Sequence, residues 1–118
     1  MTIYHKELAG GRWFTFSLVA QMANIGSEVH RTFDWFKKKE QKYFQDCFER
    51  ALELFDLTLE DNRWKGRRKE IGRTRELFCS LLLEPEKYDM EKEFDLMNKY
   101  FDYFAIQANH ERYKNRKT

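Results

Sequence analysis

A basic stretch near the middle of the chain holds the residues with the clearest chemical potential. Residues 63–76 read RWKGRRKEIGRTRE and carry seven Lys or Arg against two Glu, a net charge of +5, whereas the whole chain carries only +2. Positive charge gathered in one segment indicates a polyanion or an acidic protein as partner. The same segment can instead supply arginines to an internal salt-bridge network, so both interpretations are kept.

A helical wheel divides this stretch into two groups of charges. With Ile71 on the inner face, three basic residues point outward at a spacing of four and form what we call the basic ridge: Lys65, Lys69 and Arg73. Such a ridge is either a solvated surface or a salt-sensitive contact with phosphates. The candidate contacts with nucleic acid or an acidic partner are the basic ridge, Arg63 at its end and, in the C-terminal tail, Arg112 and Lys114.

The remaining arginines flank the inner face and have candidate carboxylate partners on the preceding helix. Antiparallel packing about a turn near residue 61 places Glu49 opposite Arg75. The same register places Asp56 opposite Arg67 or Arg68. The planar fork of Arg suits a two-bond contact with a carboxylate, so we predict structural ion pairs between these helices.

The sequence contains no recognisable catalytic or metal-binding arrangement. The three histidines, Cys47 and Cys79 show no ligand spacing, and a phosphate-binding loop and a nucleophile elbow are both absent. Glu28 and Arg31 share one stripe of the first helix, either as a structural pair or as part of a binding site. We predict no catalytic residue, no metal, no cofactor and no small-molecule substrate. An enzyme with an acid–arginine site between helices is the last alternative.

Long helices must position these residues. One proline and five glycines are few breaks for 118 residues, and apolar residues recur at spacings of three and four. The pattern predicts a first helix that begins near Thr15 or Ser17, with Gly26 allowing the close approach of another helix. It then predicts three further helices, the second of these capped by Asp61 or Asn62, over residues 40–58, 63–83 and 90–110.

Four such helices joined by short connections predict an all-α fold, an antiparallel up-down-up-down four-helix bundle. The bundle should span residues 15–110, between an N-terminal arm (1–14) and a polar, basic tail (111–118). No apolar run approaches the roughly 20 residues that cross a bilayer, and no signal peptide is visible. Two cysteines without a pairing pattern fit a reduced compartment, so we predict a cytoplasmic protein that does not contact membranes.

Several segments resemble a group of short, uncharacterised bacterial proteins of about this length. The segments that carry the resemblance are NIGSEV, ERALELFDLT, RWKGRRKEIGRTRE and KYFDYFAIQA. The resemblance implies an all-helical domain and carries no activity with it. The chain is also similar, in size, architecture and its basic helix, to the four-helix-bundle accessory subunits of diversity-generating retroelements. That second likeness implies ring assembly and contact with a reverse transcriptase and nucleic acid.

These patterns favour a non-enzymatic interaction or accessory module that self-associates or binds another protein. Aromatic side chains dominate such contacts, and the candidate anchors are Trp13, Trp35, Tyr43 and Tyr103. The alternative function is an accessory protein that binds RNA or DNA through the basic ridge and the tail.

Overall fold

The fold consists of helices only within the part of the chain that can be described. The computed structural model describes residues 5–117, apart from the side chains of residues 7, 116 and 117. The elements are α1 (Lys6–Ala9), the 3₁₀ helix η1 (Arg12–Thr15), α2 (Leu18–Lys37), α3 (Gln41–Glu60), the 3₁₀ helix η2 (Asn62–Arg67), α4 (Arg68–Leu83), the 3₁₀ helix η3 (Pro85–Lys87) and α5 (Met90–Lys117). The prediction of an all-α fold is confirmed.

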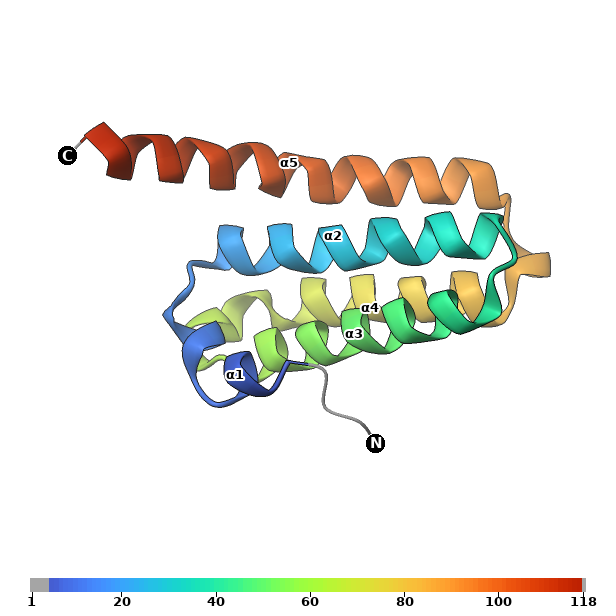
Figure 1. The fold of residues 1–118 in the computed structure, drawn as a ribbon, viewed down its shortest axis with the longest axis horizontal. Coiled ribbons are helices and arrows are strands. Elements are labelled where there is room, and N and C mark those ends of the chain that lie inside the picture. The colour runs from blue at the N-terminus through green and yellow to red at the C-terminus, as the bar shows by residue number, and fades with distance from the viewer. Residues whose placement is uncertain (1–4, 118) are drawn as a thin grey trace.

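The long helices pack as a bundle (Figure 1). Helix α2 contacts both α3 and α5, and α3 contacts α4. The connection between α2 and α3 and the one between α4 and α5 lie at the right-hand end of Figure 1, and η2 lies at the left-hand end. Helix α5 has 28 residues and projects past the start of α2 at the left. It therefore continues beyond its expected end near His110, and residues 111–117 of the expected tail are helical.

Local capping explains where the elements begin. The Ser17 hydroxyl accepts a hydrogen bond of 3.1 Å from the backbone N–H of Ala20 and caps α2, as one of the two predicted residues. The Asp61 carboxylate accepts one of 3.1 Å from the N–H of Arg63 and caps η2, again as predicted. Pro85 occupies the first position of η3, where its missing N–H does no harm.

Phenylalanine rings from all four long helices meet in the core. Phe78 of α4 lies within 6 Å, centroid to centroid, of three rings, those of Phe33, Phe48 and Phe55. Phe33 of α2 also stacks on Phe94 of α5 at 4.0 Å. Aromatic side chains each bury a large area, which lets a chain of this size fill its centre with few residues.

The predicted third helix is interrupted. Residues 62–67 form a 3₁₀ turn in which Trp64 has φ −107° and ψ 25°, and the α-helix begins only at Arg68. The prediction of one helix over 63–83 is therefore wrong for its first turns. Because the wheel assumed a single α-helix, it no longer places Lys65 on the same face as Lys69 and Arg73.

The N-terminal segment belongs partly to the core. Trp13 in η1 is 0% exposed, and its indole N–H donates a 3.0 Å hydrogen bond to Thr58 Oγ1 of α3. The backbone N–H of His5 donates to Glu53 Oε1 at 2.7 Å. The prediction of Trp13 as an exposed anchor is therefore wrong, because its ring is fully buried. Residues 1–4 of the expected arm lie outside the described range.

Candidate interaction surfaces

Arg63 is held in a network of polar groups at the end of the bundle. Its guanidinium donates two bonds to the Asp61 carboxylate, Nε to Oδ1 at 3.0 Å and Nη2 to Oδ2 at 2.7 Å, and it also donates to the Phe16 carbonyl at 2.7 Å. It lies 4.4 Å over the Trp64 ring. Arg63 therefore serves as a structural residue that joins η2 to the start of α2.

Gln21 of α2 completes this network and is fully buried. Its amide nitrogen donates to Asp61 Oδ2 and to the Trp13 carbonyl, both at 3.0 Å, and its oxygen accepts from the Trp64 indole at 3.0 Å. The hydrogen bonds from Arg63, followed in importance by the one from Gln21, lower the pKa of Asp61 to about 2 against the opposing effect of burial. Sequence reasoning missed Gln21, since a single Gln within an apolar stripe gives no signal of its role.

Two of the three flanking arginines, Arg67 and Arg75, form ion pairs, and neither has the predicted partner. Arg75 pairs with Asp56, Nε to Oδ1 at 2.9 Å, and not with Glu49. Asp56 therefore does not pair with Arg67 or Arg68. Arg67 pairs with Glu70 at 2.7 Å within its own segment, and Arg68 donates to the Leu59 carbonyl at 3.0 Å. The η2 turn consumes residues that an α-helix would have laid along α3, which shifts the register by about two helical turns.

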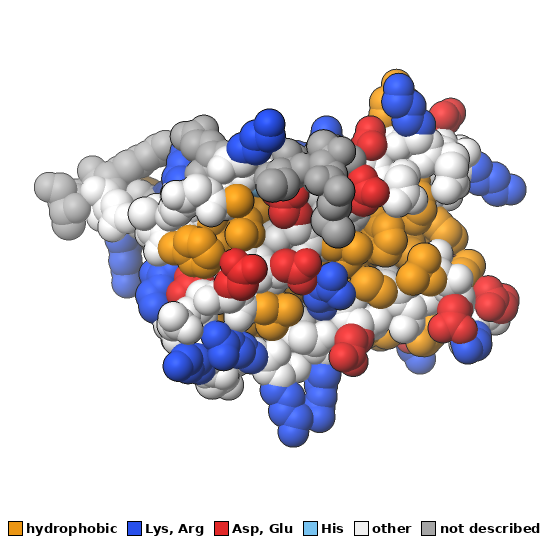
Figure 2. Space-filling model, turned by 90° about the horizontal axis from the view of Figure 1, so that it is seen from below, with side chains coloured by type: hydrophobic (Ala, Val, Ile, Leu, Met, Phe, Trp, Pro, Cys, Tyr) orange, Lys and Arg blue, Asp and Glu red, His pale blue; other side chains and the backbone are white. Residues whose placement is uncertain are grey.

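Two residues of the basic ridge remain together. Lys69 and Arg73 are both exposed and lie four residues apart on α4, while Lys65 is exposed on η2. In the tail, Lys114 is exposed and Arg112 donates to Asn109 Oδ1 at 3.0 Å. Figure 2 shows that, on the face seen from below in Figure 1, Lys and Arg side chains alternate with carboxylates and apolar groups. A polyanion could therefore contact only a few basic side chains at a time on that face.

Tyr100 of α5 bridges to α4. Its hydroxyl donates to Glu70 Oε1 at 3.0 Å, and Glu70 also accepts from Arg67. The bond from Arg67, then that from Tyr100, lowers the pKa of Glu70 although burial opposes this. Burial is the main cause that raises the pKa of Tyr100 to about 12. A neutral tyrosine beside a paired carboxylate is a stable structural contact at neutral pH.

Glu28 and Arg31 form a local pair on α2. Arg31 Nη1 lies 3.0 Å from Glu28 Oε1, and Glu28 is buried while Arg31 is exposed. Burial, and secondarily the charge of Glu28, raises the pKa of Cys47, and burial raises that of Cys79. Thiols with raised pKa values are protonated at neutral pH and are poor nucleophiles.

The outer side of α5 presents large side chains to solvent. Four of them are between 50% and 59% exposed, and we call this set the outer row: Leu96, Tyr103, Ile106 and Tyr113. Two of the other predicted anchors form their own cluster, since the rings of Trp35 and Tyr43 lie 4.8 Å apart and Lys38 lies 4.9 Å over Trp35.

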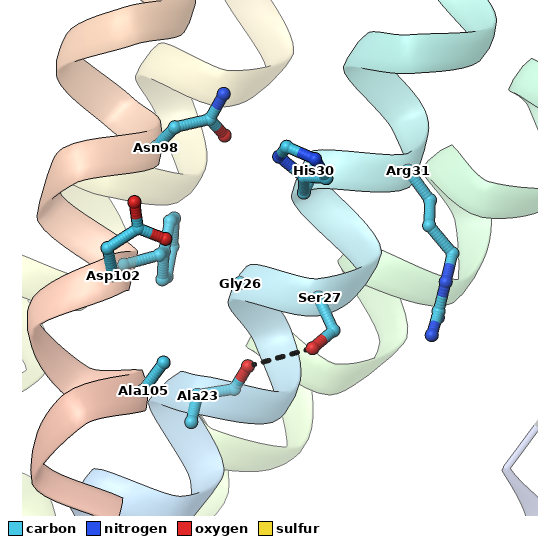
Figure 3. A pocket seen from close by; sticks show the side chains of 9 residues that line it. Ala23, Gly26, Ser27, His30, Arg31, Asn98, Asp102 and Ala105 are labelled. Atoms are coloured by element: carbon cyan, nitrogen blue, oxygen red, sulfur yellow. Dashed lines mark hydrogen bonds between the residues drawn. The ribbon is translucent and has the colours of Figure 1, made fainter.

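A groove runs between α2 and α5. Figure 3 shows one part of it: Ala23 and Gly26 of α2 face Ala105 of α5, His30 points across toward Asn98 and Asp102, and Arg31 points away. The groove continues toward the start of α2, where Ala20, Asn24 and Asn109 line it. Within the described residues, no group of three or more His, Cys, Asp or Glu could hold a metal ion.

Comparison with known proteins adds no family. No family model, no curated protein and no solved structure matches the chain. Among the described helices, none is both long and apolar enough to cross a membrane.

Proposed function

We propose that this chain is a non-enzymatic interaction module, an antiparallel up-down-up-down bundle that binds another protein, or another copy of itself, through exposed surface. The outer row on α5 is the observation that carries the proposal. A helix packed on one side normally presents mainly charged and polar residues on the other, and here four large apolar or aromatic side chains stand among the charged ones.

The charged residues beside the outer row indicate which kind of partner surface would fit it. Lys99 and Lys114 are exposed on the same helix, and the Lys99–Asp95 pair (3.1 Å) is too exposed to neutralise Lys99 strongly. A matching partner surface carries apolar side chains with carboxylates beside them. Tyr103 would be the anchor, because Tyr offers a large contact area with few rotatable bonds.

Site-specific photo-crosslinking in the cells that make the protein tests this function. A photoreactive phenylalanine analogue at position 103 should give a discrete adduct, whereas the same group at Leu83, which is 68% exposed on α4, should not. The purified adduct partner should then bind the chain with a Kd below about 10 µM, weakened at least tenfold by Ile106→Ser. The proposal fails if position 103 gives no adduct or only those seen at position 83.

A nucleic-acid-binding accessory protein is the second candidate. Exposed Lys69 and Arg73, one turn apart on α4, support it, together with the resemblance to retroelement accessory subunits. Titration with random RNA and DNA at several salt concentrations decides: binding should weaken steeply as salt rises, and Lys69→Glu with Arg73→Glu should abolish it. Equal affinity for wild type and variant would exclude this surface. An enzyme with an acid–arginine site between helices ranks third.

A further inference from the structure

The middle of the groove between α2 and α5 is formed by two segments without charged residues, whereas charged residues line the two ends of the groove. The α2 segment 18–27 reads LVAQMANIGS, and the α5 segment 104–109 reads FAIQAN, in a chain of which 36% is charged. Residues from both segments line the groove. Depletion of charge, with surface otherwise highly charged, is a property of the centres of protein–protein interfaces.

The polar side chains in this uncharged strip are already satisfied by their own helix. Asn24 Nδ2 donates to the Ala20 carbonyl at 2.7 Å, and Ser27 Oγ donates to the Ala23 carbonyl at 3.3 Å. Both side chains therefore lie against α2 and leave a low surface made mainly of alanine methyl groups. A second helix can cover such a surface closely without leaving buried donors unpaired.

Opposite charges flank the uncharged strip on α5. Asp102 precedes it and Arg112 follows it, both exposed and both lining the groove. Glu111 also lines the groove, and its carboxylate accepts a 2.8 Å hydrogen bond from Ser17 Oγ of the same subunit. Within the described part of the chain, neither Asp102 nor Arg112 forms an ion pair. When two copies of α5 lie antiparallel and face to face, Asp102 of each copy comes opposite Arg112 of the other.

We propose that the groove between α2 and α5 is the contact through which two copies of this chain form a two-fold symmetric dimer. A two-fold contact uses the same patch on both subunits, so the patch must complement itself. The strip meets this requirement. The uncharged centre of one copy would pack on the same centre of the other, and Asp102 of each copy would pair with Arg112 of the other. Ala20 lies near the centre of the strip, because it lines the groove together with Ala108 and Asn109, midway between Asp102 and Arg112.

This inference rests on the proposed function as an interaction module and uses a different surface from the outer row. The two can therefore fail separately. A groove variant that is monomeric and still gives the adduct at position 103 would retain the proposed function. A chain that dimerises without any adduct there would retain only the dimer.

A single charge placed in the centre of the groove tests the contact. The wild-type chain at about 100 µM should sediment with twice the 14.6 kDa chain mass, as expected for a Kd near 10 µM or lower. Ala20→Glu should raise the Kd at least a hundredfold, because the two introduced carboxylates would be buried near each other at the two-fold axis. Gln41→Glu, which adds the same charge at the exposed start of α3, is the matched control and should stay dimeric. Circular dichroism should give both variants the helix content of wild type, so that loss of the dimer is not loss of fold.

Charge exchange tests the antiparallel arrangement. Asp102→Arg alone and Arg112→Asp alone should each raise the dimer Kd about tenfold, and the two together should restore it to within about threefold of wild type. Three results would overturn the proposal: a wild-type monomer at 100 µM, an assembly whose mass does not respond to Ala20→Glu, or a double variant no better than the single ones.

Discussion

Gly26 of α2 and Phe101 of α5 lie so close together that a Cβ at position 26 would stand 2.6 Å from Phe101 Cβ. The sequence predicted a close helix approach at this glycine, and the structure identifies the helix as α5. Gly26→Ala should therefore force the two helices apart and lower the free energy of unfolding by about 1–3 kcal/mol, against the usual preference of helices for Ala.

Gly72→Ala is the matched control for that experiment. Gly72 lies in α4, and a Cβ added there would have no neighbouring atom within 4 Å, so its replacement should stabilise the protein by about 0.5–1 kcal/mol. Urea unfolding of both variants gives the comparison. Equal effects of the two substitutions would contradict the close packing of α2 on α5.

The Asp61 network should make stability depend on acid pH. The carboxyl pKa is lowered from 3.8 to about 2 in the folded state, so its stabilisation is complete above pH 4 and is lost as pH falls toward 2. The shift corresponds to about 2 kcal/mol. Asp61→Asn should thus be less stable than wild type at pH 7, and the gap should narrow between pH 4 and pH 2 in urea unfolding.

Asp56→Asn provides the comparison for the acid-pH experiment. Asp56 also pairs with an arginine, but its side chain is 53% exposed, and exposed pairs contribute less than about 1 kcal/mol. If Asp56→Asn lowered the free energy of unfolding as much as Asp61→Asn, burial of the Asp61 network would not make it more stabilising than an exposed ion pair.

Trp13→Phe should destabilise the fold although the residue lies in the expected arm. The substitution removes the hydrogen bond to Thr58 Oγ1 and leaves space in a fully buried site, at a cost of about 2–4 kcal/mol. Thermal unfolding measures this loss. Trp35→Phe, at a half-buried ring, should cost clearly less, and an equal cost would argue against docking of the N-terminal segment.

Tyr100 should ionise only at strongly alkaline pH. Burial raises its pKa to about 12, so a titration monitored at 295 nm should contain a late step that is absent in Tyr100→Phe. Because the folded-state pKa lies above the unfolded value near 10, this residue stabilises the fold below pH 10 and loses that contribution between pH 10 and 12. Identical titration curves of wild type and Tyr100→Phe up to pH 12 would contradict the burial of the Tyr100 hydroxyl.

The features that depend on the spacing of residue types along the chain were predicted correctly from the sequence. The stripes of α2, α3 and α5, the Ser17 and Asp61 caps and the close approach at Gly26 all follow from spacing and residue type. Register did not follow, because the 3₁₀ turn at residues 62–67 depends on a tertiary network in which Gln21, Asp61 and Arg63 take part. The ion pairs were wrong for that reason: a correct list of charged residues was placed on an uninterrupted helix.

The candidate surfaces were predictable only in part. Tyr43 and Tyr103 are exposed as expected, whereas Trp13 is buried by residues distant in sequence. The groove between α2 and α5 combines two segments about eighty residues apart, and lack of charge in either one alone is also compatible with a buried core segment.

The stacking of Phe33 on Phe94 has a consequence for synthesis of the chain. Phe94 follows Phe33 by about sixty residues, which at 5–20 residues per second corresponds to roughly 3–12 s of translation. During those seconds Phe33 of α2 has been synthesised, but Phe94, the ring that stacks on it, has not. Synthesis of the first turns of α5 is therefore the step that makes complete burial of Phe33 possible.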